Sequence, residues 1–200
     1  MAIELKKSGQ KVNLSKTSSA SIGNIMVNLN WNPTAETKKG LFGIFGSKSI
    51  DLDLGCLFEL KDGSKGAVQA LGDSFGSLLQ APYIELDGDD RTGASKAGEN
   101  LTINGDKISE IKRILLYTFI YGGTPNWATT DGIVTIKQPN ENIIIRMDEH
   151  GKNKIMCALA LFENVNNETF SVERLVKYFS SHEEMDKAFN WKIKWVAGKK

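Results

Sequence analysis

The sequence has few cysteines and no long apolar run. Only two cysteines, Cys56 and Cys157, occur among its 200 residues, and two are too few for a disulfide framework. Each lies inside an apolar stretch, so we expect two buried free thiols. No apolar stretch approaches the roughly 18 residues of a membrane-spanning helix, and the first residues lack the apolar core of a secretory signal. We therefore expect a cytoplasmic protein with no direct membrane span.

A strong charge of either sign is also absent. The chain carries 25 basic and 24 acidic residues, a formal net charge of +1. Nucleic-acid-binding domains usually show a basic patch and a high pI, so no nucleic-acid partner is expected. With 40% apolar residues and four prolines, the composition excludes a disordered or collagen-like chain. A chain of this length can form one self-sufficient core, and we predict a single domain over residues 1–200.

The sequence contains many stretches in which apolar and polar residues alternate, a pattern typical of β-strands. The run 114–121 is apolar on both faces, which predicts a central strand. Ser181 and Glu184 form a capping box, which predicts one short helix over residues 183–189. Many short strands without strand–helix alternation predict an all-β fold, a β-sandwich of two mainly antiparallel sheets with one short C-terminal helix. The predicted strands are 25–31, 52–60, 114–121, 133–136, 143–145, 155–162, 170–179 and 191–195.

One connection between predicted strands is unusual in composition. Residues 40–49 are rich in glycine and phenylalanine, and we interpret them as a mobile loop. The alternative is an apolar surface on which another protein docks.

Acidic residues gather in two places. Asp51 and Asp53 are two residues apart in a predicted strand, so both should project from the face opposite Leu52 and Leu54. Neighbours on one face of a strand are about 7 Å apart, where two like charges repel by roughly 2 kcal/mol at an effective dielectric near 20. The predicted loop 85–106 holds six acids and two bases, a local charge of −4.

Carboxylates clustered with glycine-enabled turns, and without histidine or cysteine, suit a hard cation that seeks oxygen ligands. Calcium takes six to eight oxygen ligands from carboxylates, amides, backbone and water. The spacing is not that of an EF-hand, because the twelfth position counted from Asp87 is Gly98. The residues alone leave three interpretations open: a calcium site, a solvated acidic loop, or a magnesium or catalytic metal site.

Several motifs resemble the tellurite-resistance TerD family. They cover nearly the whole chain, and the C-terminal part, residues 179–198, is similar to the TerA-like branch. The motifs are Val12-Asn13-Leu14-Ser15-Lys16, Asn30-Trp31-Asn32, Asp51-Leu52-Asp53-Leu54 and Gly88-Asp89-Asp90-Arg91-Thr92-Gly93. The resemblance implies a calcium-binding β-sandwich in a bacterial system that resists tellurite and other stresses. It also implies other tellurite-resistance proteins as partners, some of them membrane-associated, and no enzymatic activity.

The same resemblance implies a set of metal ligands. Asp51 and Asp53 match the paired strand aspartates of the family, and Asp89 and Asp90 fall on its Gly-Asp-Asn motif, with Asp90 in place of the usual Asn. A second family motif, Gly-Asp-Gly-Asp-Asp-Glu, is reduced here to residues 96–100. The predicted Ca²⁺ ligands are Asp51, Asp53, Asp89, Asp90 and Glu99, with Asp87, Asn100 and Asp106 as further contributors.

Two other functions remain as alternatives to a calcium-binding stress-response module. One is a metal-independent scaffold of the same system that binds proteins through residues 40–46. The other is a hydrolase, because Gly72-Asp73-Ser74-Phe75-Gly76 matches the G-x-S-x-G motif and is followed by Asp148 and His182. The motif requires a strand, a sharp turn and then a helix. The stretch after Ser74 is too short for that helix, so we do not expect an enzyme.

Overall fold

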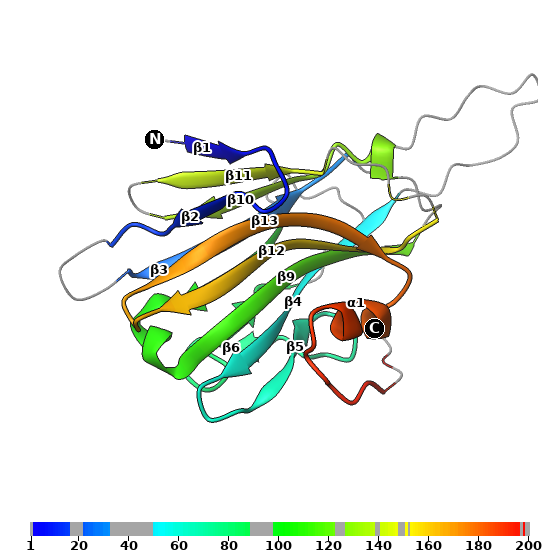
Figure 1. Ribbon diagram of the computed structural model, residues 1–200. Helices are drawn as coiled ribbons and strands as arrows, with labels where there is room; N and C mark the ends of the chain where they lie inside the picture. The colour runs from blue at the N-terminus through cyan, green and yellow to red at the C-terminus, as the bar shows by residue number, and fades with distance from the viewer. Residues whose placement is uncertain are drawn as a thin grey trace, which may run out of the picture.

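A computed structural model describes residues 2–16, 22–32, 50–88, 98–122, 127–138, 141–147, 151, 153–196 and 198. The predicted loop 40–49 lies outside these residues. In the described part of the chain, two β-sheets pack face to face, and one helix lies against the outside of the second sheet near the C-terminus (Figure 1). The predicted all-β sandwich with one short C-terminal helix is confirmed.

The first sheet has the strand order β1-β11-β10-β3-β8-β7-β6. Its pairs are antiparallel except β1 with β11, which is parallel. Its strands are β1 (Ala2–Leu5), β3 (Asn24–Asn30), β6 (Gly76–Ser77), β7 (Ile84–Leu86), β8 (Glu99–Asn104), β10 (Ile133–Lys137) and β11 (Asn142–Arg146). Two 3₁₀ turns, η1 (Gly105–Glu110) and η2 (Trp127–Thr129), connect strands.

The second sheet is antiparallel and has the order β2-β13-β12-β9-β4-β5. Its longest strand, β9, lies between β12 and β4, which confirms the central strand predicted from its two apolar faces. The strands are β2 (Lys11–Asn13), β4 (Asp51–Leu60), β5 (Lys65–Gln69), β9 (Ile111–Gly122), β12 (Met156–Val165) and β13 (Thr169–Phe179).

The apolar side chains form two separate cores. The larger lies between the sheets and contains Leu29 of β3, Leu54 of β4 and Leu101 of β8. The smaller covers the outer face of the second sheet, where Leu57 and Tyr117 contact residues from the C-terminal helix and the segment after it. Both faces of β4 and β9 are therefore buried, as the continuous apolar run in β9 requires. Both cysteines are buried thiols that form no disulfide, as predicted.

The sequence predicted a single loop over residues 85–106, and this prediction is wrong. β7 and β8 occupy its two ends and pair with one another, with Leu86 opposite Leu101. The reason is a short alternation in which Glu99, Leu101 and Ile103 are all buried. Acidic residues on either side of this alternation obscured it.

Helix α1 (His182–Ala188) begins at the predicted capping box, where the side chain of Ser181 accepts a hydrogen bond from the Glu184 amide. The strand predicted over residues 191–195 is wrong, because these residues form no strand. Asn190 and Lys192 have positive φ angles of 55° and 63°, which are incompatible with a regular strand. Asp186 accepts hydrogen bonds from the amides of Lys192 (2.7 Å) and Ile193 (2.8 Å), so these donors do not enter a sheet.

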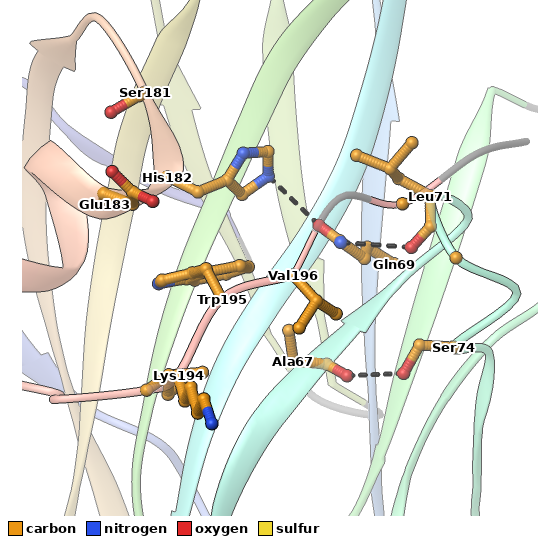
Figure 2. A pocket seen from close by; sticks show the side chains of 13 residues that line it. Ala67, Gln69, Leu71, Ser74, Ser181, His182, Glu183, Lys194, Trp195 and Val196 are labelled. Carbon is orange, nitrogen blue, oxygen red and sulfur yellow. Dashed lines mark hydrogen bonds between the residues drawn. The ribbon is translucent and has the colours of Figure 1, made fainter.

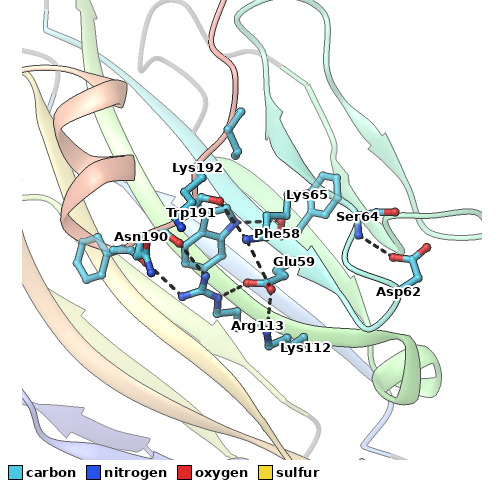
Figure 3. Close-up of polar contacts among 12 residues, drawn as sticks. Phe58, Glu59, Asp62, Ser64, Lys65, Lys112, Arg113, Asn190, Trp191 and Lys192 are labelled. Carbon is cyan, nitrogen blue, oxygen red and sulfur yellow. Dashed lines mark hydrogen bonds and ion pairs between the residues drawn. The ribbon is translucent and has the colours of Figure 1, made fainter.

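Residues 190–196, the C-terminal segment, contact the second sheet through Trp191. Its indole is fully buried, and its Nε1 donates to the Phe58 carbonyl at 3.0 Å. The guanidinium of Arg113 lies 3.8 Å from the centre of the indole ring and also binds Glu59 (Figure 3). Burial opposes ionisation of Glu59, but Lys112 and Arg113 hold its pKa below the usual range. Among the described residues, no helix has the length and apolarity needed to cross a membrane.

Candidate functional site

Three acidic residues lie in the first positions of β4 and β8, and we call this group the acidic end. Asp51 and Asp53 are 7% and 0% exposed, and Glu99 is 1% exposed. Charged residues are seldom buried to this degree unless they are paired or bind a metal. The acidic end shares this burial with Glu59 and Asp186, and it differs from the exposed acids of the surface.

A hydrogen bond joins the two sheets at the acidic end. β5 pairs with Gly55–Glu59 of β4, one residue short of Leu54. The Leu54 amide instead donates to Oε2 of Glu99 at 2.6 Å. A short bond to a carboxylate oxygen is typical of a charge-assisted interaction. The β8 carboxylate is thus held against the strand that carries Asp51 and Asp53.

Asp53 lies on the outer face of the second sheet, as the alternation predicted. Leu52 and Leu54 point into the core between the sheets. Asp53 is close enough to Tyr117 to affect the pKa of its hydroxyl, and the Tyr117 ring covers Gly55 on the outer face. Burial, together with nearby Cys56 and Asp53, raises the pKa of Tyr117 well above its usual value. Tyr117 is therefore a neutral hydroxyl beside an acidic group.

Asp87 and Asn100 form a second group on the other face of β8. Asn100 follows Glu99 in the strand and so projects to the opposite side. Its Nδ2 donates to Oδ2 of Asp87 at 2.8 Å, and its backbone amide donates to Oδ1 of Asp87 at 3.1 Å. Nδ2 of Asn28 donates to Oδ1 of Asn100 at 2.8 Å. These bonds fix the strands on both sides of segment 89–97.

Gly98 has a specific steric role at the start of β8. Its φ is +65°, and a Cβ at this position would lie 2.1 Å from the Leu29 carbonyl oxygen. Only glycine fits so close to β3 without moving the backbone. This contact fixes the point where the segment carrying Asp89 and Asp90 enters β8.

The remaining predicted ligands have different positions. Asp89 and Asp90 lie outside the described residues. Asp106 is in η1, beyond the far end of β8, and the length of β8 alone separates it from Glu99 by about 17 Å. Within the described residues, no three histidine, cysteine, aspartate or glutamate side chains converge closely enough to hold a metal ion. The side chains of the acidic end carry only oxygen donors, the type of ligand that calcium takes in proteins.

Ser74 and His182 of the hydrolase alternative lie on the same cavity but have separate partners (Figure 2). Ser74 Oγ donates to the Ala67 carbonyl at 2.7 Å, and Nε2 of His182 lies 3.1 Å from Oε1 of Gln69. The Gly-Asp-Ser-Phe-Gly motif forms the turn between β5 and β6 and precedes a two-residue strand. Asp148 lies outside the described residues.

Sequence reasoning missed the group formed by Gln69, Tyr117 and His182. Oε1 of Gln69 is 2.5 Å from the Tyr117 hydroxyl and is also the partner of His182. The three residues come from β5, β9 and α1, which are distant in the chain. The sequence contains one indication of this group. The run 114–121 predicts a central strand, and a central strand implies that Tyr117 is buried.

Comparison with known proteins gives consistent results. A family model described as the TerD domain matches residues 1–169. The tellurium resistance protein TerA of Alcaligenes sp is 44% identical over 200 residues, and the match covers 99% of this chain and 58% of that protein. The chain thus spans little more than half of the length of this relative.

Solved structures share the fold at low sequence identity. A crystal structure of a protein of unknown function has a TM-score of 0.61 at 14% identity and covers 80% of this chain and 91% of its own. A homologue of the telluride resistance protein TerD from Streptomyces coelicolor has a TM-score of 0.56 at 16% identity, covering 82% and 95%.

Proposed function

The chain belongs to the TerD-domain family of the tellurium resistance system, and on this premise we propose that it is a calcium-binding module of that system. It would act by binding the metal and other tellurium-resistance proteins in the cytoplasm rather than by catalysis. The observation that carries the proposal is the acidic end, where a buried carboxylate of β8 is held at the amide between Asp53 and Leu54 of β4.

Electrostatics suggests how the metal would act. Segment 85–106 has a net charge of −4, and it includes β8, whose first residue is Glu99 of the acidic end. Like charges at short distance destabilise the compact state unless a cation offsets them. Asp51, Asp53 and Glu99 do not converge on one point in this structure, so they would have to move toward the ion, and Asp89 and Asp90 would approach it from the connecting segment. Bound Ca²⁺ supplies the positive charge that lowers this repulsion.

The proposal predicts that Ca²⁺ stabilises the folded chain. A ligand that binds only the folded state contributes about 2.7 kcal/mol at a hundredfold excess over Kd, which raises the melting temperature of a chain of this size by roughly 5–10 °C. We expect this increase between EDTA and millimolar CaCl₂ in a circular dichroism melt. The double variant Asp51→Asn/Asp53→Asn should melt at the same temperature in both buffers, and Glu99→Gln should show a smaller increase than the wild type.

Asp106→Asn provides the matched control, because it removes one acid of the same segment at the far end of β8. It should retain the full response to calcium. Magnesium at equal concentration should stabilise the protein less, since it demands a smaller octahedral site. A wild-type melt that calcium leaves unchanged would refute the proposal, and so would equal losses in Asp106→Asn and the double variant.

A further inference from the structure

A cavity of about 650 Å³ lies between β5 and the C-terminal segment. Ala67, Leu71 and Ser74 form one side, and His182, Lys194 and Trp195 form the other (Figure 2). Cavities of roughly 300–1,000 Å³ lined by apolar groups and a few placed polar groups are typical of small-molecule sites. This cavity is separate from the acidic end and is not used by the proposed calcium function.

Most polar groups on the cavity wall already have partners. Nε2 of Gln69 donates to the Leu71 carbonyl at 3.1 Å, which fixes the orientation of the amide. Oε1 of Gln69 then accepts hydrogen bonds from Tyr117 and from His182. Because Ser74 donates to Ala67, the surface offered to an occupant is mainly apolar.

Trp195 gives this apolar surface a rigid aromatic face. Its Nε1 donates to Oδ2 of Asp186 at 3.1 Å, so the indole cannot turn freely. Its ring centre lies 4.9 Å from that of His182, at an interplanar angle of 47°. Val196, next in the chain, is 81% exposed and also lines the cavity. A rigid aromatic wall lowers the entropic cost of binding a flat or apolar group.

The cavity lining carries one charged residue of each sign, and the positive one lies on the C-terminal segment. Glu183 and Lys194 are the charged residues that line it. Lys194 belongs to the last ten residues of the chain, which contain four lysines and no acid. An acidic group on a bound molecule could therefore form an ion pair with Lys194, next to the indole of Trp195.

We propose that this cavity binds a small amphipathic organic anion, with its apolar or aromatic body against Trp195 and its acidic group at Lys194. The cavity would accept the free anion as a ligand. It would not act as a nucleophilic site, because Ser74 and His182 have separate hydrogen-bond partners.

The test uses anilinonaphthalene sulfonate, a fluorescent aromatic anion, and its uncharged analogue N-phenylnaphthylamine, both titrated against the full chain in EDTA. The wild type should bind the sulfonate at a single saturable site and bind the uncharged analogue more weakly. Lys194→Gln should weaken sulfonate binding by about threefold to fivefold, the range expected for a partly exposed ion pair. Lys192→Gln, two residues away and outside the cavity lining, should leave it unchanged.

Further variants test the location and the sign of the charge. Leu71→Trp narrows the cavity and should reduce sulfonate binding at least tenfold. Val196→Glu adds a negative charge at an exposed position and should have the same effect without unfolding the protein, which a thermal melt checks. Glu183→Gln should leave binding equal or tighter. The proposal fails if the wild type takes up no probe, if both probes bind equally well, or if folded Leu71→Trp and Val196→Glu bind like the wild type.

Discussion

His182 shows how the environment of one residue changes its chemistry. Its imidazole lies against the rings of Tyr117, Phe119 and Trp195, with ring centres 5.6, 5.1 and 4.9 Å away. Burial disfavours the charged imidazolium and lowers the pKa of His182 from 6.5 to about 4. The neutral ring can donate through Nε2 to Gln69 at any pH above that value. From the sequence, His182 is only a polar residue at the start of a short helix.

This depressed pKa predicts a specific loss of stability in mild acid. Between pH 6.5 and about 4 the unfolded chain protonates His182 and the folded chain does not, so the free energy of unfolding falls as the pH falls through this window. The full effect corresponds to roughly 3 kcal/mol. His182→Gln keeps a side-chain donor but cannot titrate, so the wild type should lose more stability than this variant in urea unfolding from pH 7 to pH 4. Parallel stability curves for the two proteins would contradict the assignment.

The C-terminal segment is the element whose structure departs most from its sequence pattern. Trp191, Ile193 and Trp195 alternate with lysines as in an edge strand. The Asp186 carboxylate nevertheless accepts hydrogen bonds from two backbone amides and from the indole N–H of Trp195. These bonds hold the segment out of the sheet. Because the hydrogen bonds depend on the position of a helix residue several positions earlier, alternation alone could not predict them.

Removing the Asp186 carboxylate should release the C-terminal segment. Asp186→Ala leaves three donors without their acceptor, and hydrogen bonds to a charged group contribute about 1.5–3 kcal/mol each at most. We expect a loss of roughly 2–4 kcal/mol in urea unfolding and faster proteolytic cleavage after residue 189. Asp62→Ala is the control, because Asp62 accepts a hydrogen bond from the Ser64 amide in an exposed turn, and it should lower the stability much less than Asp186→Ala does. Equal stability of both variants would show that Asp186 does not hold the segment.

Prediction from the sequence succeeded for the long strands and for the five-residue strands β10 and β11, but it missed β7 and β8 within the acidic segment. β9 and β4 have ten residues or more, enough for the alternation of apolar residues to define both faces. β7 has three residues and β8 has six, and the acids around them resemble a loop. The sequence indicated Asp51, Asp53 and Glu99 as acids of interest, but the bond from Leu54 to Glu99 depends on how two sheets align. That alignment is set by packing and cannot be read from either strand alone.

At the scale of the whole molecule, a net charge of +1 combines separated groups of opposite sign. Acids collect at the ends of β4 and β8, while the last ten residues carry four lysines. The first group lies where the two sheets are joined by Glu99, and Lys194 of the second group lines the cavity beside β5. The outer core links the two regions, because Tyr117 is close to Asp53 and binds Gln69 in the cavity wall. We therefore propose that one region binds a metal ion and the other an organic anion.

Native mass spectrometry during a calcium titration tests the central claim most directly, because it counts bound ions on the intact chain. Starting from protein treated with EDTA, the account predicts that the wild type and Asp106→Asn gain Ca²⁺ with the same stoichiometry. The Asp51→Asn/Asp53→Asn variant should gain none at the same concentrations. A wild-type chain that stays free of calcium, or a double variant that binds as many ions as the wild type, would contradict the account.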